Sequence, residues 1–284
     1  MAERYMAQIL QGEFGRATIN TTGQPIVEHA HREFNVIIKL SGADTCLQSG
    51  EVSLSVDDDS VVLLNPWVVH AKHPSDSGPA TILSLFLNPS WLASEFPHTA
   101  LHLDHLFPAP RVALVDELRD NVQLLVAAIS MHSLASPGLC EERLKAVVDT
   151  VVRHYANLDA AGAALRHTRP SDRRIRKAIA YIHEHAAENP KVGDITRSAG
   201  ISRSHFFSQF SRCVGVSPRH YIDSLRLGIA TRWLATTDRP LTDLADELGF
   251  GTHSNFTRFF TRHMALSPSE FRRRATDLAL LERQ

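Results

Sequence analysis

The stretch from residue 241 to residue 274 reads LTDLADELGFGTHSNFTRFFTRHMALSPSEFRRR and sets the fold of the C-terminal third of the chain. Apolar residues at helical spacing predict a short helix that Gly249 ends, because glycine suits the left-handed position after a helix. Thr252 or Ser254 can cap a second helix, which an aromatic stripe gives one buried face. Two short helices joined by a tight turn predict a helix-turn-helix unit, whose second helix can enter a DNA major groove. The apolar residues are Leu244, Ala245, Leu248, Phe256, Phe259 and Phe260.

The same pattern occurs about 50 residues earlier, in VGDITRSAGISRSHFFSQFSRCV from residue 192 to residue 214. Gly200 stands where Gly249 stands in the later copy, and Ser202 is the expected helix cap. Each copy is followed by a Ser-Pro pair that predicts the start of a new helix, with proline in its first turn. The chain therefore contains two helix-turn-helix units. The matching residues are Phe206 and Phe210 beside Phe256 and Phe260, and Ser217-Pro218 beside Ser267-Pro268.

These two units resemble the DNA-binding domain of the AraC/XylS family of bacterial transcription regulators. The family pattern has an apolar Gly-Phe turn, a recognition helix with an F-x-R-x-F core, a Ser-Pro pair and an aromatic-Arg pair. One departure is Ala265, which stands where the family has glycine, so a left-handed backbone there would strain it. The matching segments are Gly249-Phe250, Phe256-Thr257-Arg258-Phe259-Phe260, Ser267-Pro268 and Phe271-Arg272.

The resemblance implies which side chains touch DNA. Arginine reads guanine bidentately and asparagine reads adenine, so the second unit is expected to be the better base reader. Two roles stay open: Arg258 as a base reader, a phosphate contact or a salt-bridge partner, and Phe207 as a core residue or a contact to a thymine methyl group. The candidate DNA-binding residues are Arg203, Ser204, Phe207, Ser208 and Arg212 in the first unit and His253, Ser254, Asn255, Arg258 and Arg262 in the second.

Charge is divided unevenly along the chain. Residues 166–275 hold 19 Lys and Arg against 10 Asp and Glu, a net +9, whereas residues 1–165 have a net charge of −9. A basic C-terminal domain suits phosphate contact. Together with the two helix-turn-helix units, this asymmetry predicts binding to double-stranded DNA.

The cysteines and the apolar runs bear on the compartment. Cys46, Cys140 and Cys213 are widely spaced and odd in number, which favours a reducing cytoplasm over a disulfide framework. Residues 1–10 lack the features of a signal peptide, and no apolar run approaches the roughly 20 residues of a membrane span. We therefore expect a cytoplasmic protein with no membrane partner.

Residues 1–105 are predicted to form β-structure. Short apolar runs are separated by turn residues, a spacing typical of a small antiparallel barrel or jelly roll. The acidic run at residues 57–59 is interpreted as a hairpin turn and not as a metal loop, since it lacks further oxygen ligands at useful spacing. The predicted strands include residues 34–40, 52–56, 61–64 and 81–87.

Histidines cluster in this β-region. His29 and His31 share one face of a strand, since residues i and i+2 point the same way, and Pro66 and His70 follow further along. With Gly23 and Gly42, this pattern resembles the cupin barrel that precedes the DNA-binding domain in many AraC-family members. The cupin glutamate is missing, because Asn35 and Val36 lie at that position.

Three interpretations of His29, His31, His70 and His73 stay open. They hydrogen-bond a small effector in the barrel, they are structural or exposed, or they bind a divalent metal such as Zn²⁺ through neutral imidazoles. We take His29, His31, His70 and Trp67 as effector-binding residues, with Trp67 stacking on the effector or packed in the core. The resulting prediction is no resident cofactor, and the metal reading of His29, His31 and His70 is kept as the alternative.

Residues 106–158 are predicted to form two helices separated by Pro137-Gly138. The apolar stripe of the second helix is wide enough to pack on the barrel, on the first helix or across a dimer. Since the family places its dimer contacts in such helices, we expect a self-association surface here. The stripe comprises Leu144, Val147, Val148, Val151, Val152, Tyr155 and Leu158.

The C-terminal region completes the organisation. Residues 159–170 are expected to be a linker, residues 171–275 the DNA-binding domain and residues 276–284 a tail. A helix over residues 218–236 is expected to hold the two recognition helices one groove repeat apart, about 34 Å. Its predicted apolar stripe is Tyr221, Leu225, Ile229, Trp233 and Leu234.

These parts predict an α+β fold, with a cupin-like barrel followed by two helices, a linker and an all-α double helix-turn-helix domain. Two function classes compete, a metal enzyme built on the barrel and a non-catalytic regulator. The missing glutamate and the lack of a P-loop or Ser/His/Asp signature favour the regulator. The resemblance implies a homodimeric activator that binds DNA, a small-molecule effector and RNA polymerase; an effector-independent regulator with a degenerate barrel is the further alternative.

Overall fold

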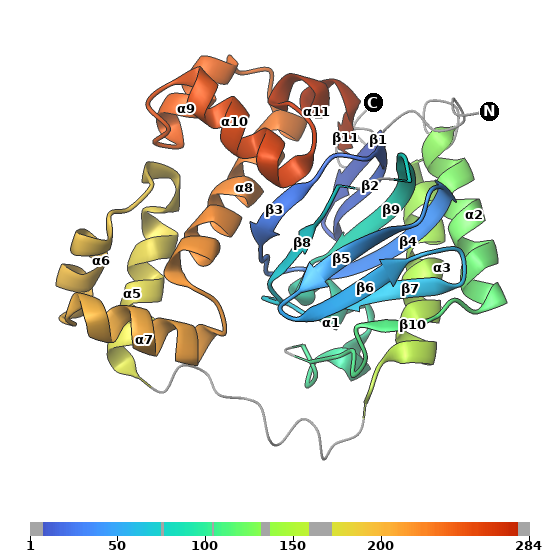
Figure 1. The fold of residues 1–284 in the computed structure, drawn as a ribbon, viewed down its shortest axis with the longest axis horizontal. Coiled ribbons are helices and arrows are strands. Elements are labelled where there is room, and N and C mark those ends of the chain that lie inside the picture. Colours follow the sequence, from blue (N-terminus) through green and yellow to red (C-terminus); the bar gives the residue numbers. More distant parts are fainter. Residues whose placement is uncertain (1–7, 75–76, 104, 132–136, 159–171, 278–284) are drawn as a thin grey trace.

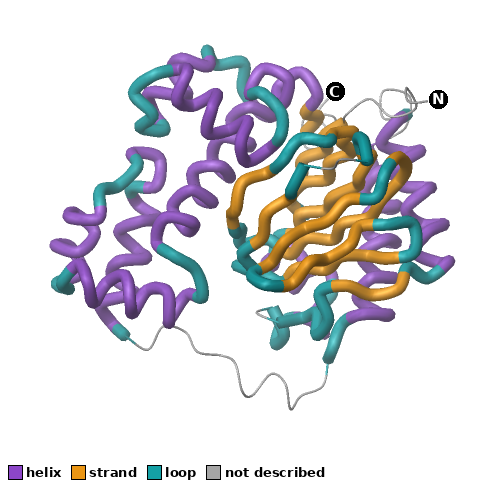
Figure 2. Tube along the Cα trace, viewed as in Figure 1, coloured by secondary structure: helices purple, strands orange, loops and turns teal. Residues whose placement is uncertain are grey.

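The computed structural model describes residues 8–74, 77–103, 105–131, 137–158 and 172–277. Its N-terminal part consists of two facing sheets, one with the strand order β10-β7-β4-β9-β2-β1-β11 and one with the order β3-β8-β5-β6 (Figures 1 and 2). Most neighbouring strands are antiparallel, and together they form the barrel that the spacing of the apolar runs predicts. The strands are β1 (Gln8–Gly12), β2 (Gly15–Thr22), β3 (Ile26–His29), β4 (Phe34–Gly42), β5 (Thr45–Ser49), β6 (Val52–Val56), β7 (Ser60–Leu64), β8 (His70–Lys72), β9 (Ala80–Leu87), β10 (Arg111–Ala113) and β11 (Ala275–Asp277).

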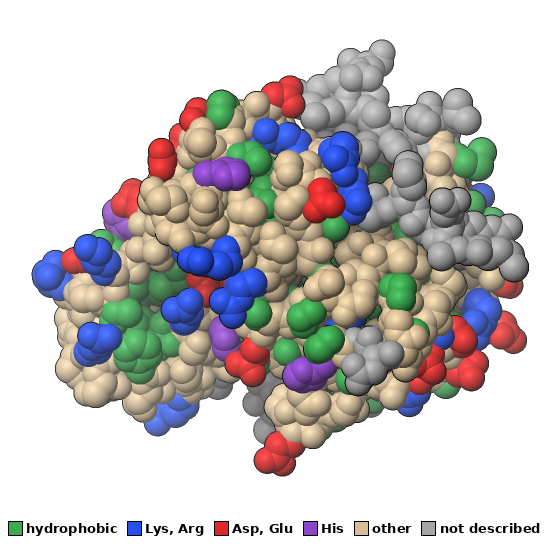
Figure 3. All heavy atoms as spheres, turned by 45° about the horizontal axis from the view of Figure 1, so that its top comes forward, with side chains coloured by type: hydrophobic (Ala, Val, Ile, Leu, Met, Phe, Trp, Pro, Cys, Tyr) green, Lys and Arg blue, Asp and Glu red, His purple; other side chains and the backbone are tan. Residues whose placement is uncertain are grey.

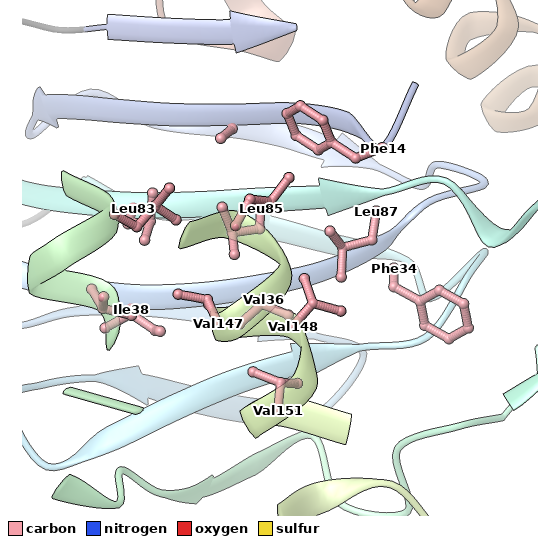
Figure 4. Packing of buried hydrophobic residues seen from close by; sticks show 14 of the residues in the cluster. Phe14, Phe34, Val36, Ile38, Leu83, Leu85, Leu87, Val147, Val148 and Val151 are labelled. Carbon is pink, nitrogen blue, oxygen red and sulfur yellow. The ribbon is translucent and has the colours of Figure 1, made fainter. Parts of the chain in front are cut away.

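Two helices cover the outer face of the larger sheet: α2 (Asp116–Ser130) and α3 (Pro137–Tyr155). Leu83, Leu85 and Leu87 of β9 meet Val147 and Val148 of α3 in one buried cluster (Figure 4). Short helices α1 (Pro89–Glu95) and η1 (Pro97–Thr99) follow β9. Burying the side chains of this cluster is worth about 1.5–3 kcal/mol for each large aliphatic residue, so α3 is an integral part of the barrel domain.

This packing corrects the expected self-association surface. Leu144, Val147, Val148, Val151 and Val152 are each at most 2% exposed within a single chain. The stripe of α3 is wide because it contacts both the sheet and α2, and none of those five side chains is left for a partner. A homodimer remains a prediction, but it needs another surface.

The C-terminal part is all helical up to residue 274 and is organised along α8 (Pro218–Thr236). At one end of α8 lie α5 (Arg173–Glu184), α6 (Val192–Ala199) and α7 (Arg203–Val214); at the other lie α9 (Leu241–Glu247), α10 (His253–Met264) and α11 (Pro268–Arg274) (Figure 1). The short helix η2 (Ala186–Glu188) contacts α8. The predicted linker at residues 159–170 lies outside the described residues.

The buried face of α8 differs from the predicted stripe. Tyr221 and Leu234 are buried as expected, but Leu225, Ile229 and Trp233 are only partly buried, and Arg226 is 4% exposed. The reason is that α8 serves two helix-turn-helix units and the barrel on different sides, so no single stripe describes it.

The predicted tail begins in the sheet. Ala275, Thr276 and Asp277 pair in parallel with Ile9, Leu10 and Gln11 of β1, so the last described strand extends the N-terminal sheet. All three cysteines are free, and no helix among the described residues is long and apolar enough to cross a membrane.

Candidate functional site

The first helix-turn-helix unit consists of α6 and α7. Gly200 ends α6 in the left-handed conformation, and the Ser202 hydroxyl caps α7 by accepting from the His205 amide at 3.4 Å. Phe206 and Phe210 are fully buried, which holds α7 against its neighbours. The opposite face carries the predicted DNA-binding side chains. Arg203, Ser204, Phe207, Ser208 and Arg212 are all exposed.

The exposure of Phe207 decides whether it is a core residue, which was one of its two predicted roles. Its side chain is 38% exposed, and the Arg203 guanidinium lies 6.0 Å from its ring centre. It is therefore a surface residue and not part of the core, which leaves its ring available for an apolar contact. Ser204 and Ser208 have short side chains, so this unit offers little hydrogen-bonding reach toward base edges.

The second unit consists of α9 and α10, with Gly249 in the left-handed conformation between them. Thr252, and not Ser254, caps α10 by accepting from the Asn255 amide at 3.2 Å. Phe256 and Phe260 are fully buried, whereas Phe259 is partly buried against Phe250. The predicted readers His253, Ser254, Asn255, Arg258 and Arg262 are all exposed.

Two of these readers are already arranged together. Arg258 donates to the Asn255 side-chain oxygen at 2.8 Å, and Asn255 donates to the Phe250 carbonyl at 3.2 Å. This hydrogen-bonded pair reduces the rotamer freedom that either side chain loses on contacting a base. It also replaces the salt bridge that was one reading of Arg258, because its observed partner is a neutral amide.

α8 lies between the two helix-turn-helix units, and its 19 residues span about 28 Å. Arginine and lysine side chains gather over this helical half on the face shown in Figure 3.

Arg226 joins α8 to the second unit and escaped the sequence reasoning. Its guanidinium donates to the Leu248 carbonyl and lies 3.8 Å from the centre of the Phe250 ring. Burial lowers the pKa of Arg226 to about 10, which leaves it charged near neutral pH. No local sequence pattern indicates that a single arginine on a helix is buried.

A groove of ≈ 690 Å³ runs between the second unit and the barrel. Asn255, Arg258 and Arg262 line one side of it, and Glu28 of β3 lies on the other. Glu28 pairs with His220 of α8 at 3.7 Å. Three of the predicted DNA-binding residues thus line a groove that they share with strand β3 of the barrel.

Within the barrel, the structure brings His29, His31 and His70 together. Their rings lie 4.3 Å (His29 to His70), 5.1 Å (His31 to His70) and 5.8 Å (His29 to His31) apart, centre to centre. Burial lowers the pKa of all three imidazoles, and repulsion from His70 lowers those of His29 and His31 further. They are therefore neutral near pH 7. His73 is exposed and is not part of this group.

The histidines adjoin a cavity of ≈ 100 Å³ between the two sheets, which His29 and His70 line. Asn35 and Thr45 also line it, and the side-chain oxygens Asn35 Oδ1 and Thr45 Oγ1 are buried with no hydrogen-bond partner among the described residues. Leaving such an atom unpaired costs about 1–3 kcal/mol, so this lining is suited to a polar ligand.

Trp67 is not at this cavity. It stacks on Tyr221 of α8 at 4.6 Å between ring centres, with 22° between the planes, where the first unit meets the barrel. The expected stacking on an effector is therefore replaced by an interdomain contact. No local sequence pattern indicates this contact, because the partner ring lies far along the chain.

The cavity is closed by the DNA-binding half. His263 and Met264 at the end of α10, and Leu266 beyond it, contribute to its lining. The His263 ring lies 6.2 Å from that of His29. A ligand in the barrel would thus touch the end of the second recognition helix.

Comparisons with known proteins agree with this arrangement. Residues 195–274 match a family model described as a helix-turn-helix domain. The lactose operon transcription activator of Staphylococcus xylosus is 30% identical over 98 residues, which cover 34% of this chain and 35% of that protein. An uncharacterised HTH-type transcriptional regulator of Bacillus subtilis, YobQ, is 35% identical over 95 residues, covering 34% of this chain and 39% of that protein. The chain thus matches about a third of the length of these curated relatives.

Among solved structures, ToxT from Vibrio cholerae has a similar fold over both halves. One crystal form gives a TM-score of 0.56 at 15% identity, covering 91% of this chain and 98% of ToxT. A structure of ToxT with an unsaturated fatty acid bound gives a TM-score of 0.51 at 16% identity, covering 96% of this chain and 97% of ToxT. At this level of identity the likeness concerns the fold: a sheet-rich N-terminal region followed by a helical one.

Proposed function

We propose that this chain, which belongs to the AraC-type family of helix-turn-helix transcription regulators, binds double-stranded DNA through α7 and α10 under the control of a small molecule in the barrel. Its two recognition helices would enter successive major grooves. Asn255 and Arg258 would read bases, and Arg203, Arg212 and Arg262 would contact phosphates. On this proposal it is a regulator and not an enzyme.

One observation carries the proposed control: the barrel cavity is walled on one side by the end of α10. A ligand that contacts His29 and His70 also lies against His263 and Met264. Its binding free energy then depends on where α10 sits, and by linkage DNA binding changes the affinity for the ligand by the same factor. The unpaired Asn35 and Thr45 oxygens favour an effector with hydrogen-bond donors.

Selection of sites from random double-stranded DNA by the full-length protein tests the DNA part. We expect an enriched site and a footprint over two major-groove segments about one helical turn apart. Affinity should fall steeply with salt, since several arginines would displace counterions. Enrichment of no sequence, with equal affinity for all fragments, would contradict the proposal.

A metabolite screen by thermal shift of the full-length protein tests the effector part. A true effector should raise the melting temperature and change the affinity for the selected site, and Asn35→Ala should weaken both effects. A compound that stabilises the protein but leaves DNA affinity unchanged would speak for a regulator whose barrel is not coupled to DNA.

Three finer expectations complete the proposal. The Staphylococcus xylosus relative is named as a transcription activator, which supports activation with RNA polymerase as a further partner. The three free cysteines favour a reducing cytoplasm. In vitro transcription from a promoter that carries the selected site would give the sign of regulation, and sedimentation would test the expected homodimer.

A further inference from the structure

The three barrel histidines share one feature that effector binding alone does not require. In each, Nδ1 lies within hydrogen-bond distance of the carbonyl oxygen of a residue two positions away: 2.8 Å for His29, and 2.9 Å for His31 and His70. A carbonyl only accepts, so Nδ1 must carry the proton and Nε2 must hold the lone pair in the neutral ring. Backbone carbonyls thus hold all three histidines in the same tautomer, with the proton on Nδ1.

The three imidazole rings bring nitrogen atoms close together. One ring nitrogen from each of the three histidines lies within 4.8 Å of the others, and since Nδ1 is engaged with a carbonyl, Nε2 is the nitrogen available to a ligand. His31 Nε2 is buried and has no hydrogen-bond partner among the described residues, in a side chain that is nine-tenths buried. Buried acceptors without a donor are rare, and a cation bound between the three rings would satisfy this one.

We propose that His29, His31 and His70 bind a divalent transition-metal ion of the zinc class through their Nε2 atoms. Three imidazoles whose other nitrogen donates to a backbone carbonyl are the usual arrangement of a histidine metal site, because the second contact fixes both the tautomer and the ring orientation. An effect of the ion on regulation rests on the proposed function, but the binding of the ion does not depend on it.

The geometry is compatible with this ion. Tetrahedral zinc with bonds of about 2.0–2.1 Å needs ligand nitrogens about 3.3 Å apart, so nitrogens that lie up to 4.8 Å apart need to approach by about 1.5 Å or less. Only a small rotation of the histidine side chains is needed to move the ring nitrogens over that distance. Among the described residues, the cavity that His29 and His70 share is lined by no Asp or Glu but by Lys72, and Glu33 lies 3.8 Å from His31 Nδ1, outside that cavity. Three histidine ligands leave a coordination position for water or an exogenous ligand.

The site lies beside the DNA-binding half. The His263 ring on α10 is 6.2 Å from His29, and its Nδ1 contacts the Phe259 carbonyl at 2.8 Å, which leaves its own Nε2 unprotonated in the neutral ring. Metal binding would therefore order the barrel wall against which α10 packs. The affinity for DNA should depend on metal occupancy.

Titration of the full-length, chelator-treated protein with Co²⁺ tests the site, with visible absorption as the readout and Zn²⁺ as competitor. We expect about one equivalent per chain with the spectrum of a four-coordinate ion, displaced by Zn²⁺. His70→Gln and the less buried His29→Gln should each lower the affinity at least about tenfold. Zn²⁺ should raise the melting temperature of the wild type and not of these variants.

His73→Gln is the matched control, because His73 is exposed and the chain has 16 histidines that can bind metal adventitiously. This variant should keep the wild-type affinity. Circular dichroism of each variant without metal separates loss of a ligand from loss of the fold. No uptake at equimolar metal, or equal affinity in wild type and both site variants, would overturn the proposal.

The same samples separate the two proposals. Affinity for the selected DNA site is measured with and without Zn²⁺. A protein that binds this DNA but takes up no metal refutes the metal site alone, and a protein that takes up metal but selects no DNA site refutes the proposed function alone.

Discussion

The two helix-turn-helix units have nearly the same backbone but different surroundings. The core of the first unit includes Ala30, Trp67 and Val69 of the barrel, whereas the core of the second includes Ile9, and its helix α10 also closes the barrel cavity. The recognition faces differ as well: Ser208 stands in the first unit where Arg258 stands in the second. A motif that occurs twice thus has two different settings: the first unit packs on the barrel through Trp67 and Val69, and the second presents the larger polar side chains beside the barrel cavity.

The largest expected effect comes from Arg226, which serves the second unit. Arg226→Ala removes a buried stem and its ring contact, and leaves the Leu248 carbonyl without its donor, so we expect a loss of about 3–4 kcal/mol in the free energy of unfolding. Urea denaturation of the full-length protein measures it. The control is Arg219→Ala on the same helix, whose side chain is 86% exposed and should change stability by less than about 0.5 kcal/mol. Similar effects of the two variants would refute the bridging role.

The two turn glycines form a matched pair. Gly249 and Gly200 have φ of 65° and 64°, but a Cβ on Gly249 would lie 2.8 Å from the Glu188 carbonyl oxygen, whereas one on Gly200 would meet nothing within 4 Å. We expect Gly249→Ala to cost about 2–3 kcal/mol and Gly200→Ala about 1 kcal/mol, the left-handed strain alone. Chemical denaturation compares them, and equal costs would show that the close approach to Glu188 is relieved without strain.

The difference between the two recognition faces is tested on DNA. Arg258→Ala should weaken binding to the selected site by about 1–3 kcal/mol, and Ser208→Ala at the matching place in α7 should have a much smaller effect. Fluorescence anisotropy on selected and random duplexes measures both. If Arg258→Ala weakens the two duplexes equally, Arg258 contacts only phosphate.

The smallest expected effect concerns the residue after each recognition helix. Gly215 and Ala265 both adopt the left-handed conformation, with φ of 86° and 54°. Ala265→Gly should therefore stabilise the protein by about 0.5–1 kcal/mol, since relief of strain exceeds the added freedom of the unfolded chain, and Gly215→Ala should destabilise it by a similar amount. Thermal unfolding of both variants checks the opposite signs, and a destabilising Ala265→Gly would show that Ala265 is not strained.

Local patterns predicted the C-terminal half well. The turn glycines, the Ser-Pro starts of α8 and α11, and the buried Phe206, Phe210, Phe256 and Phe260 all depend on neighbours within a few residues. The strands β4, β6, β7 and β9 were predicted for the same reason, since their apolar runs are continuous. β2 reads GRATINTT and is mostly polar, so its place inside the sheet, between β9 and β1, depends on those two strands and not on its own composition.

Features that need two distant segments could not be predicted. The burial of Arg226, the stacking of Trp67 on Tyr221 and the place of His263 beside His29 each depend on the docking of the two halves. The stripe of α3 shows the converse: its amphipathic width was evident, but only the packed structure distinguishes the barrel from a partner chain. The histidine group was predictable in part. Strand periodicity places His29 and His31 on one face, but the position of His70 beside them depends on the pairing of β3 with β8.

The parallel pairing of β1 with β11 links the beginning of the chain to its end. During synthesis β1 emerges early, and its outer edge stays without a partner until residues 275–277 leave the ribosome. Ile9 likewise stays exposed until the second unit is made and buries it. A chain that stops before residue 275 would leave the outer edge of β1 unpaired, and unpaired strand edges favour aggregation. The pairing of β11 with β1 therefore makes completion of this sheet a late step of folding during synthesis.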